Sequence, residues 1–231
     1  MINAVIFDMD GVLCDSEPFI CEASVDMFRM RHGVTVQPTD FHPFTGMGED
    51  RFLSGVAELY NVAINIKSDK KFTYDRYLEI IKGRLTPLHG TADFIAACRA
   101  RNLRLAVASS ADRIKVEGNL KQIGIPLSHF HAVIDGTMVE LKKPAPDIFL
   151  LAARQLGVLP AECVVFEDAV SGIEAARAAG MYAVGVRSSL NHATLSQAGA
   201  HSTVQDLSEA LAAIATLETN NKLNTTNRIE G

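Results

Sequence analysis

The feature that most constrains this chain is a short apolar run near its start that ends in two acidic residues. Residues 4–7 (AVIF) are followed at once by Asp8, then Asp10 and Gly11. Such a run is typical of a strand buried on both faces of a parallel sheet. Open α/β sheets bind ligands just beyond the carboxyl ends of their strands. The sequence therefore predicts two carboxylates at the edge of a sheet where chemistry is usually done.

Two carboxylates held this close repel each other. The Coulomb energy is about 4 kcal/mol at ~4 Å and an effective dielectric constant of ~20. A shared proton, a nearby Lys or Arg, or a divalent cation can offset that repulsion. This stretch alone also leaves open an ordinary strand end followed by an Asx turn, with Gly11 supplying the turn. The rest of the chain has to supply the counter-charge.

Composition excludes several classes of protein. A chain of 231 residues, 48% of them apolar, forms one large domain or two modest ones with an ample core. The net charge of −5 argues against a nucleic-acid partner, and no apolar run approaches the ~20 residues of a membrane span. The chain starts directly with the first strand, so we expect no signal or transit segment. The four cysteines form no C-x-x-C pair, which favours free thiols in a reducing compartment, and we expect a cytoplasmic protein.

Residues 15–85 have helical periodicity and no strand signal. Ser16, followed by an acid and a proline, predicts a capped helix that runs to Gly33. We expect further helices from Glu49 and from about residue 68. We interpret the segment as a helical cap over the site, with residues 12–16 and 84–90 as hinges; a plain helical decoration is the alternative.

If the segment is a cap, its loop from Gly46 to Arg51 faces the substrate. Gly46, Glu49 and Arg51 are then candidate substrate contacts, with Arg51 as a possible anion contact or an ordinary solvated arginine.

The α/β pattern resumes after residue 90 and supplies further polar groups at strand ends. A strand of residues 103–108 ends on Ser109 and Ser110, whose hydroxyls and adjacent N–H groups can bind an oxyanion. Lys143 stands in the sequence LKKPAPD, where two prolines predict a rigid turn. A fixed lysine near carboxylates supplies positive charge for an anionic substrate, although in isolation each feature also fits an ordinary helix cap or a surface lysine.

A second acidic pair follows another buried strand. Residues 163–166 (CVVF) end on Glu167 and Asp168. Acidic pairs at two strand ends of one parallel sheet can converge on a single cation. Ligands that are all oxygen favour Mg²⁺, which retains waters and prefers to bind a phosphate as well. A magnesium ion would resolve the repulsion at Asp8 and Asp10.

These observations predict an α/β fold with an inserted cap. We expect residues 1–14 and 86–217 to form a Rossmann-like parallel sheet with helices on both faces. Residues 15–85 would be the helical cap domain. The polar residues 218–231 are expected to be a disordered tail.

Four stretches together resemble the haloacid dehalogenase superfamily: the DMDGV run at Asp8, Ser109, Lys143 in KPAPD, and the EDAVSG run at Glu167. Their order and spacing match over about residues 1–215. The insert resembles the small cap of the β-phosphoglucomutase-like branch. Residues 41–56 and 107–121 also resemble the haloacid dehalogenase domain of a plant thylakoid multidomain protein.

The resemblance implies a role for each motif. Asp8 would attack phosphorus and form an aspartyl-phosphate, while Asp10 would protonate the leaving oxygen and later activate water. Ser109, with Ser110 beside it, and Lys143 would hold the phosphoryl group. Mg²⁺ would be bound by the Asp8 carboxylate, the main-chain carbonyl of Asp10 and Asp168, with Glu167 as a further ligand or in support. 

The expected activity is Mg²⁺-dependent hydrolysis of a small phosphorylated metabolite, such as a sugar phosphate, by a monomer. Asp10 argues against dehalogenation, because a halide leaving group needs no proton. Two alternatives stay open: a β-phosphoglucomutase-type mutase and a catalytically silent binding or regulatory domain. The mutases of this branch carry a His where this chain has Ile20, and an Arg immediately before the position of Glu49; this chain has neither. 

Overall fold

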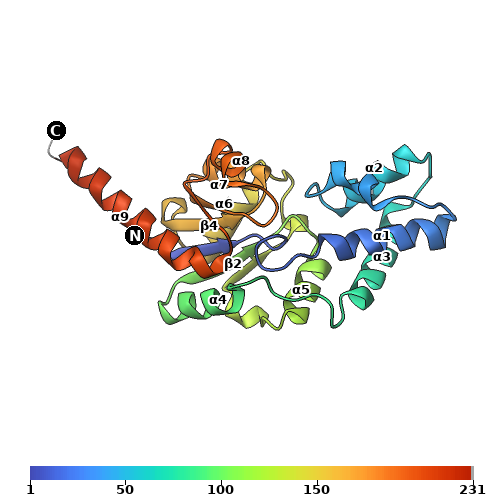
Figure 1. Cartoon of the computed structure of the whole chain (residues 1–231), viewed down its shortest axis with the longest axis horizontal. Helices are drawn as coiled ribbons and strands as arrows, with labels where there is room; N and C mark the ends of the chain where they lie inside the picture. Colours follow the sequence, from blue (N-terminus) through green and yellow to red (C-terminus); the bar gives the residue numbers. More distant parts are fainter. Residues whose placement is uncertain (230–231) are drawn as a thin grey trace.

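A six-stranded parallel sheet forms the centre of the larger lobe of the molecule (Figure 1). The computed structural model describes the backbone of residues 1–229 and the side chains of residues 1–219. The strands lie in the order β3-β2-β1-β4-β5-β6. Their bounds are β1 (Ala4–Phe7), β2 (Arg104–Ala108), β3 (Ala132–Ile134), β4 (Cys163–Glu167), β5 (Tyr182–Val186) and β6 (Ser202–Val204). The α/β fold expected from the sequence is confirmed.

Strand β1 lies in the middle of the sheet and is fully buried. Its last residue, Phe7, is in register with Val107 of β2 and Phe166 of β4. The residues that follow therefore leave the sheet at one edge, and the N–H of Asp8 still donates to the carbonyl of Phe166 at 3.0 Å. This register places the polar strand ends side by side.

Helices cover both faces of the sheet, since successive residues of a buried strand point to opposite faces. Val5 and Phe7 pack into one core cluster, and Ala4 and Ile6 into another. Phe7 and Phe94 meet edge to face with ring centroids 5.7 Å apart. The first face carries α4 (Thr91–Ala100), α5 (Arg113–Gln122) and α9 (Ala210–Ile229), and the second carries α6 (Asp147–Leu156), α7 (Val170–Ala178) and α8 (His192–Gln197).

The segment between β1 and α4 forms a second, helical lobe at one end of the molecule (Figure 1). It contains α1 (Glu17–His32), the 3₁₀ helix η1 (Pro38–Phe44), α2 (Glu49–Leu59) and α3 (Ile66–Ile80). The ring of Phe41 joins its parts, with centroids 6.2 Å from Phe28 and 4.7 Å from Phe52. Its apolar residues continue into the core cluster on one face of the sheet. We propose that this lobe is the cap domain of residues 15–85.

The two linkers between the lobes run beside each other. The N–H of Leu88 donates to the carbonyl of Leu13 at 2.9 Å, and Cys14 forms a β-bridge with Pro87. Because the linkers are paired, a movement of one carries the other with it. We propose that they act together as the hinge.

Helix α9 continues beyond residue 217, where we expected the core domain to end. It includes residues up to Ile229, where we expected a disordered tail. A helix can continue in this way because, once a packed first part exists, each added residue gains a backbone hydrogen bond without a new nucleation cost. Residues 230–231 lie outside the described part of the chain. Among the described residues, no helix is long and apolar enough to cross a membrane.

Gly90, in the second linker, is packed against backbone. Its φ is +79°, and a Cβ there would lie 2.2 Å from the main-chain nitrogen of Ser208, whereas Gly124, with φ of +73°, has nothing within 4 Å. We predict that Gly124→Ala costs about 1 kcal/mol through its backbone conformation alone. Gly90→Ala should cost at least about 2 kcal/mol more, because two backbone segments must separate. Urea unfolding of both variants measures the difference, and equal losses would contradict the prediction.

Candidate active site

Lys143 supplies the counter-charge that the sequence requires beside Asp8. Its Nζ lies 2.5 Å from Oδ1 of Asp8 and 2.8 Å from Oε1 of Glu167, and its side chain is 5% exposed. Burial raises the pKa of Asp8 to about 7 although Lys143 opposes the rise. Burial lowers the pKa of Lys143, but the two carboxylates outweigh that effect and raise it above its ordinary value. One ammonium group thus stabilises two carboxylates from β1 and β4.

Asp168 lies against the turn that follows β1. Ser189 donates its hydroxyl proton to Oδ2 of Asp168 at 2.5 Å, and Ser188 donates to the carbonyl of Gly11 at 2.6 Å. A Cβ on Gly11, whose φ is +70°, would lie 2.0 Å from Oδ2 of Asp168, so a glycine is required there. Burial, followed by the charges of Glu167 and Asp8, raises the pKa of Asp168 well above its ordinary value.

The oxygen atoms of the acidic residues at this edge suit a cation that needs few protein ligands. No three His, Cys, Asp or Glu side chains of the described residues are grouped to hold a metal. Asp8 and Asp168 nevertheless face the same cavity as Asp10, and burial together with neighbouring carboxylates raises the pKa of both Asp8 and Asp168. Mg²⁺ keeps several waters and is held in many sites by one or two carboxylates. The carboxylates of Asp8 and Asp168 therefore fit Mg²⁺.

Glu167 has both carboxylate oxygens occupied. Oε1 accepts from Lys143, and Oε2 accepts from the N–H of Ala169 at 2.7 Å. A Cβ on Gly172 would lie 1.7 Å from Oε1, so the first turn of α7 packs directly against this carboxylate. This arrangement orients Lys143 toward Asp8.

The two serines after β2 lie at the same edge. Ser109 is buried, and its Oγ accepts from the N–H of Ala111 at 3.2 Å. Ser109 and Ser110 both line the cavity, next to the start of α5. Hydroxyl and main-chain N–H groups are available there for an oxyanion.

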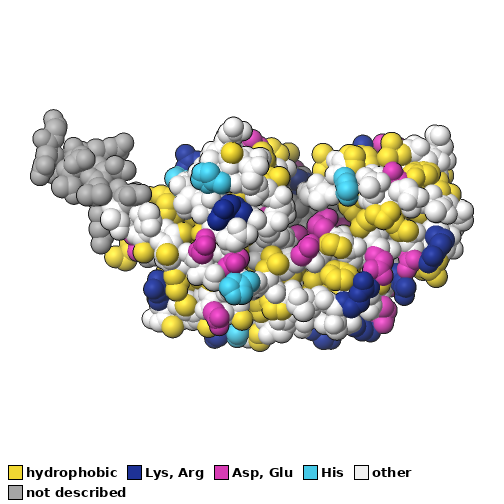
Figure 2. Space-filling view, in the orientation of Figure 1, with side chains coloured by type: hydrophobic (Ala, Val, Ile, Leu, Met, Phe, Trp, Pro, Cys, Tyr) yellow, Lys and Arg dark blue, Asp and Glu magenta, His cyan; other side chains and the backbone are white. Residues whose placement is uncertain are grey.

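A cavity of about 830 Å³ lies between the sheet edge and the cap. Figure 2 shows the hollow between the two lobes, with acidic side chains beside it. The sheet side of its wall contains the sequence-predicted residues Asp8, Asp10, Ser109, Ser110, Lys143, Glu167 and Asp168. The cap side includes Glu17, Ile20, His42, Phe44, Gly46, Glu49 and Phe52.

Arg51 does not belong to the cavity wall, although the sequence made it a candidate anion contact. Its Nη1 lies 2.7 Å from Oε1 of Glu58, and its guanidinium lies 4.9 Å from the ring centroid of Phe44. The other two cap candidates, Gly46 and Glu49, line the cavity. The other interpretation of Arg51, a surface arginine, agrees with its 45% exposed side chain.

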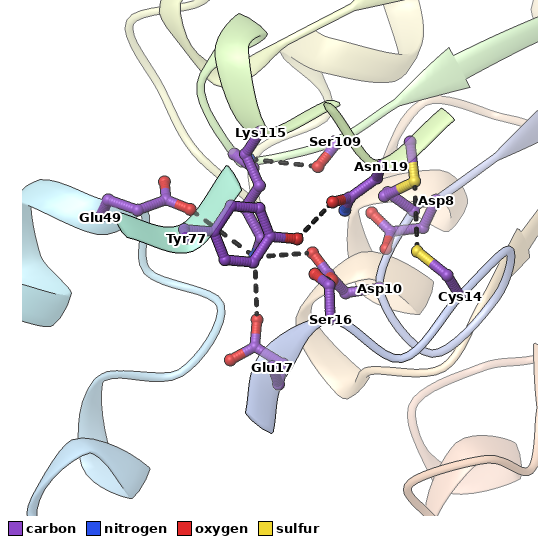
Figure 3. A network of polar contacts seen from close by, with 12 residues as sticks. Asp8, Asp10, Cys14, Ser16, Glu17, Glu49, Tyr77, Ser109, Lys115 and Asn119 are labelled. Carbon is purple, nitrogen blue, oxygen red and sulfur yellow. Dashed lines mark hydrogen bonds and ion pairs between the residues drawn. The ribbon is translucent and has the colours of Figure 1, made fainter. Parts of the chain in front are cut away.

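Two residues whose role the sequence did not reveal hold Asp10 (Figure 3). Lys115 of α5 is 2% exposed, and its Nζ lies 3.1 Å from Oδ2 of Asp10. Ser16 is the residue just before α1, but its hydroxyl donates to Oδ1 of Asp10 and makes no cap hydrogen bond. The expectation of a capping side chain was therefore wrong. A signal for Lys115 was present: a cation in the first turn of a helix opposes the helix dipole and needs acidic partners.

A parallel α/β sheet, an inserted helical cap and an acidic cluster at the carboxyl edge define a class of hydrolase. The chain belongs to the haloacid dehalogenase-like hydrolases, whose family model matches residues 2–180. 

The chain is similar in sequence to three known proteins. The chain is 44% identical over 204 residues to Protein SUPPRESSOR OF QUENCHING 1, chloroplastic, of Arabidopsis thaliana; the alignment covers 86% of this chain but 19% of that protein. It is 31% identical to the Phosphorylated carbohydrates phosphatase of Thermotoga maritima, covering 86% and 92% of the two chains. It is 33% identical to the Beta-phosphoglucomutase of Bacillus subtilis, covering 80% and 83%.

A solved structure supports the fold. The crystal structure of CbbY from Rhodobacter sphaeroides in complex with phosphate superposes with a TM-score of 0.79. The two chains are 27% identical, and the match covers 90% of this chain and 96% of the other. 

We predict that Asp168→Asn stabilises the metal-free protein. A raised pKa means that the folded state holds a proton that the unfolded chain releases, so stability falls as pH rises above the usual 3.8 of this carboxyl toward its raised value. In EDTA at pH 8 the variant should melt higher by about 2–4 °C, the shift that 1 kcal/mol gives at this size. The gain should vanish near pH 4.

Ser189→Ala is the matched control, because it removes the hydrogen bond to Asp168 and keeps the charge. It should not stabilise the protein at pH 8. Melting curves in EDTA and in Mg²⁺ give the comparison, and Mg²⁺ should raise the melting temperature of the native chain more than that of Asp168→Asn. If Asp168→Asn is less stable than the native chain in EDTA at pH 8, the carboxylate of Asp168 does not destabilise the metal-free protein.

Proposed function

We propose that this protein is a Mg²⁺-dependent phosphatase that hydrolyses a small phosphorylated metabolite, a sugar phosphate or a similar phosphomonoester. One observation carries the proposal: Asp8, Ser109, Lys143 and Asp168, which lie up to 160 positions apart in the sequence, line one cavity. The names of the Thermotoga and Bacillus relatives support a phosphorylated sugar as substrate. A monomer in the cytoplasm remains our expectation for its state and location.

Asp8 is proposed as the nucleophile. Its carboxylate oxygen attacks phosphorus, the bond from phosphorus to the leaving oxygen breaks, and an aspartyl-phosphate forms. Lys143 and Ser109 hold the phosphoryl oxygens during the transfer. Mg²⁺, held by Asp8, the carbonyl of Asp10 and Asp168, would neutralise charge on those oxygens, the main requirement of phosphoryl transfer. 

Asp10 is proposed as the general acid and base. It gives a proton to the leaving oxygen in the first step and takes one from water in the second, when water attacks phosphorus and Asp8 is released. Glu167 is proposed to orient Lys143 instead of binding metal, since both its oxygens already accept hydrogen bonds.

The cap side of the cavity favours hydrolysis over the mutase alternative. A mutase has to bind a second phosphate, but this wall presents the carboxyl groups of Glu17 and Glu49 and apolar side chains including Ile20. Lys115 and Lys143 are the lysines of the described lining, and each is already paired with carboxylates. A second phosphate would thus meet negative charge. The silent-domain alternative has no observation in its favour, because every proposed group is present.

The test is phosphate release from a panel of sugar monophosphates, their bisphosphates, nucleotides and phosphorylated acids. We predict release from a sugar monophosphate, abolished by EDTA and restored by Mg²⁺, with kcat/KM at least about tenfold lower for the matching bisphosphate, a difference of about 1.4 kcal/mol. β-Glucose 1-phosphate is included, and glucose 6-phosphate is followed as a product. Isomerisation without phosphate release would establish the mutase alternative. Activity that EDTA does not change would refute the requirement for Mg²⁺.

We predict that Asp8→Asn lowers kcat by at least about 10³-fold, because an amide cannot replace the attacking carboxylate. The fold should survive, since an amide has the shape of the carboxylate it replaces; circular dichroism checks this. A folded variant that keeps more than a few per cent of the activity would refute the assignment of the nucleophile.

A further inference from the structure

Lys115 is a buried ammonium group that none of the roles above uses. Its Nζ faces three carboxylates: it lies 3.1 Å from Oδ2 of Asp10, 3.5 Å from Oε1 of Glu17 and 3.7 Å from Oε1 of Glu49. These come from the loop after β1, the first turn of α1 and the first turn of α2 (Figure 3). One lysine of the larger lobe thus joins a site carboxylate to two helices of the cap.

The surroundings keep this lysine charged. Burial lowers the pKa of Lys115, but Asp10, Glu17 and Glu49 outweigh that effect and raise it well above the ordinary value. The side chain is 2% exposed, so solvent screens these interactions little. The carboxylates also offset the repulsion between a cation and the first turn of α5.

Asp10 is held at both oxygens. Lys115 donates to Oδ2, and the Ser16 hydroxyl donates to Oδ1. Ser16 lies in the first linker and Lys115 on α5, so the plane of the carboxylate is set jointly by the hinge and the core. A group that moves a proton in two steps depends on such orientation.

The same face of α5 makes a second contact with the cap. Asn119, one turn after Lys115, accepts a hydrogen bond from the hydroxyl of Tyr77 on α3. Residues four apart share a helix face. This face of α5 therefore contacts or pairs with α1, α2 and α3, and any opening of the cap withdraws Glu17 and Glu49 from Lys115.

We propose that Lys115 is a positioning residue: it holds the carboxylate of Asp10 for proton transfer and, through Glu17 and Glu49, couples that position to closure of the cap. The proposal rests on the proposed phosphatase function. When the cap is closed, three carboxylates share one ammonium group; when it opens, Asp10 alone keeps the contact.

Kinetics of Lys115→Met test the coupling to Asp10. A sugar leaving group must be protonated, whereas p-nitrophenolate leaves without a proton. The value of kcat/KM reports the first phosphoryl transfer, and kcat also includes hydrolysis of the phosphoenzyme. We expect kcat/KM to fall about 10²-fold for the sugar phosphate, at the lower end of what general acid–base catalysis contributes. For p-nitrophenyl phosphate, kcat/KM should change less than about threefold while kcat falls.

Lys70→Met is the matched control. Lys70 also bridges the two lobes, since its Nζ lies 2.6 Å from Asp50 of α2 and 2.8 Å from Asp112 beside α5. It does not touch Asp10. Its loss should affect both substrates equally and weakly, and the same pattern in Lys115→Met would overturn the proposal.

Hydrogen–deuterium exchange gives a readout that needs no substrate. Lys115→Met should exchange faster at the amides of Phe19 and Ile20, which donate to the carbonyl of Ser16 in the first turn of α1, and Lys70→Met should leave them unchanged. If Lys115→Met exchanges faster at these amides but the native protein releases no phosphate from any compound, the phosphatase proposal is refuted. The contact between Lys115 and the cap is then still supported. Unchanged exchange would refute the coupling even in an active enzyme.

The double variant Lys115→Met with Glu49→Gln covers the case in which Lys115→Met does not fold. It restores the net charge of the cluster, because one positive and one negative group are removed together. It should fold and show the same separation between the two substrates as the single variant. A double variant with native kinetics on both substrates would show that Asp10 needs no contact from Lys115.

Discussion

At the carboxyl edge of the sheet, Asp8, Asp10, Glu167 and Asp168 bring four carboxylates to one cavity, and the described residues of its wall offer two lysines. Their mutual repulsion is the constraint on which the rest of the arrangement depends. Lys143 satisfies Asp8 and Glu167, Lys115 satisfies Asp10, and hydroxyl groups satisfy Asp168. Negative charge between Asp8 and Asp168 remains uncompensated. A divalent cation can neutralise it and bind a phosphoryl group at the same time.

The grouping of polar residues at one edge of the sheet could be predicted, because it follows from a local rule. Parallel strands end at one side of the sheet, so a polar residue after each apolar run belongs there whatever the loops between them do. Asp8, Ser109 and Asp168 needed only this rule and the chain order. The role of Glu167 was left open between metal ligand and support, because the choice depends on Lys143 and Ala169, whose positions come from separate turns.

Of the three cap candidates, Arg51 is the one that the cavity wall lacks, and placing it required the rotation of a helix. Glu49 and Arg51 are two residues apart, so they point about 200° apart around α2. Glu49 faces the cavity, and Arg51 consequently faces Glu58. Lys115 was missed for the opposite reason: its partners lie 66 to 105 positions away in the sequence, and no local pattern specifies them. Composition alone is also a weak guide to secondary structure at the end of the chain. The polar residues after 217 suggested a tail, whereas the described backbone is helical up to Ile229.

The arrangement around Asp10 indicates how the two lobes share one task. A cap that only covered the cavity would need apolar contacts with the core and no buried charge at the seam. Here the seam contains a lysine and two glutamates, although buried ion pairs contribute little net stability relative to apolar packing. We infer that these charged groups serve to orient Asp10 more than to stabilise the fold. Each glutamate holds the ammonium group of Lys115 in place, and that ammonium group holds Asp10. On the proposed function, the sheet edge thus supplies the reacting groups, and the closed cap adds the two glutamates that fix the ammonium group beside Asp10.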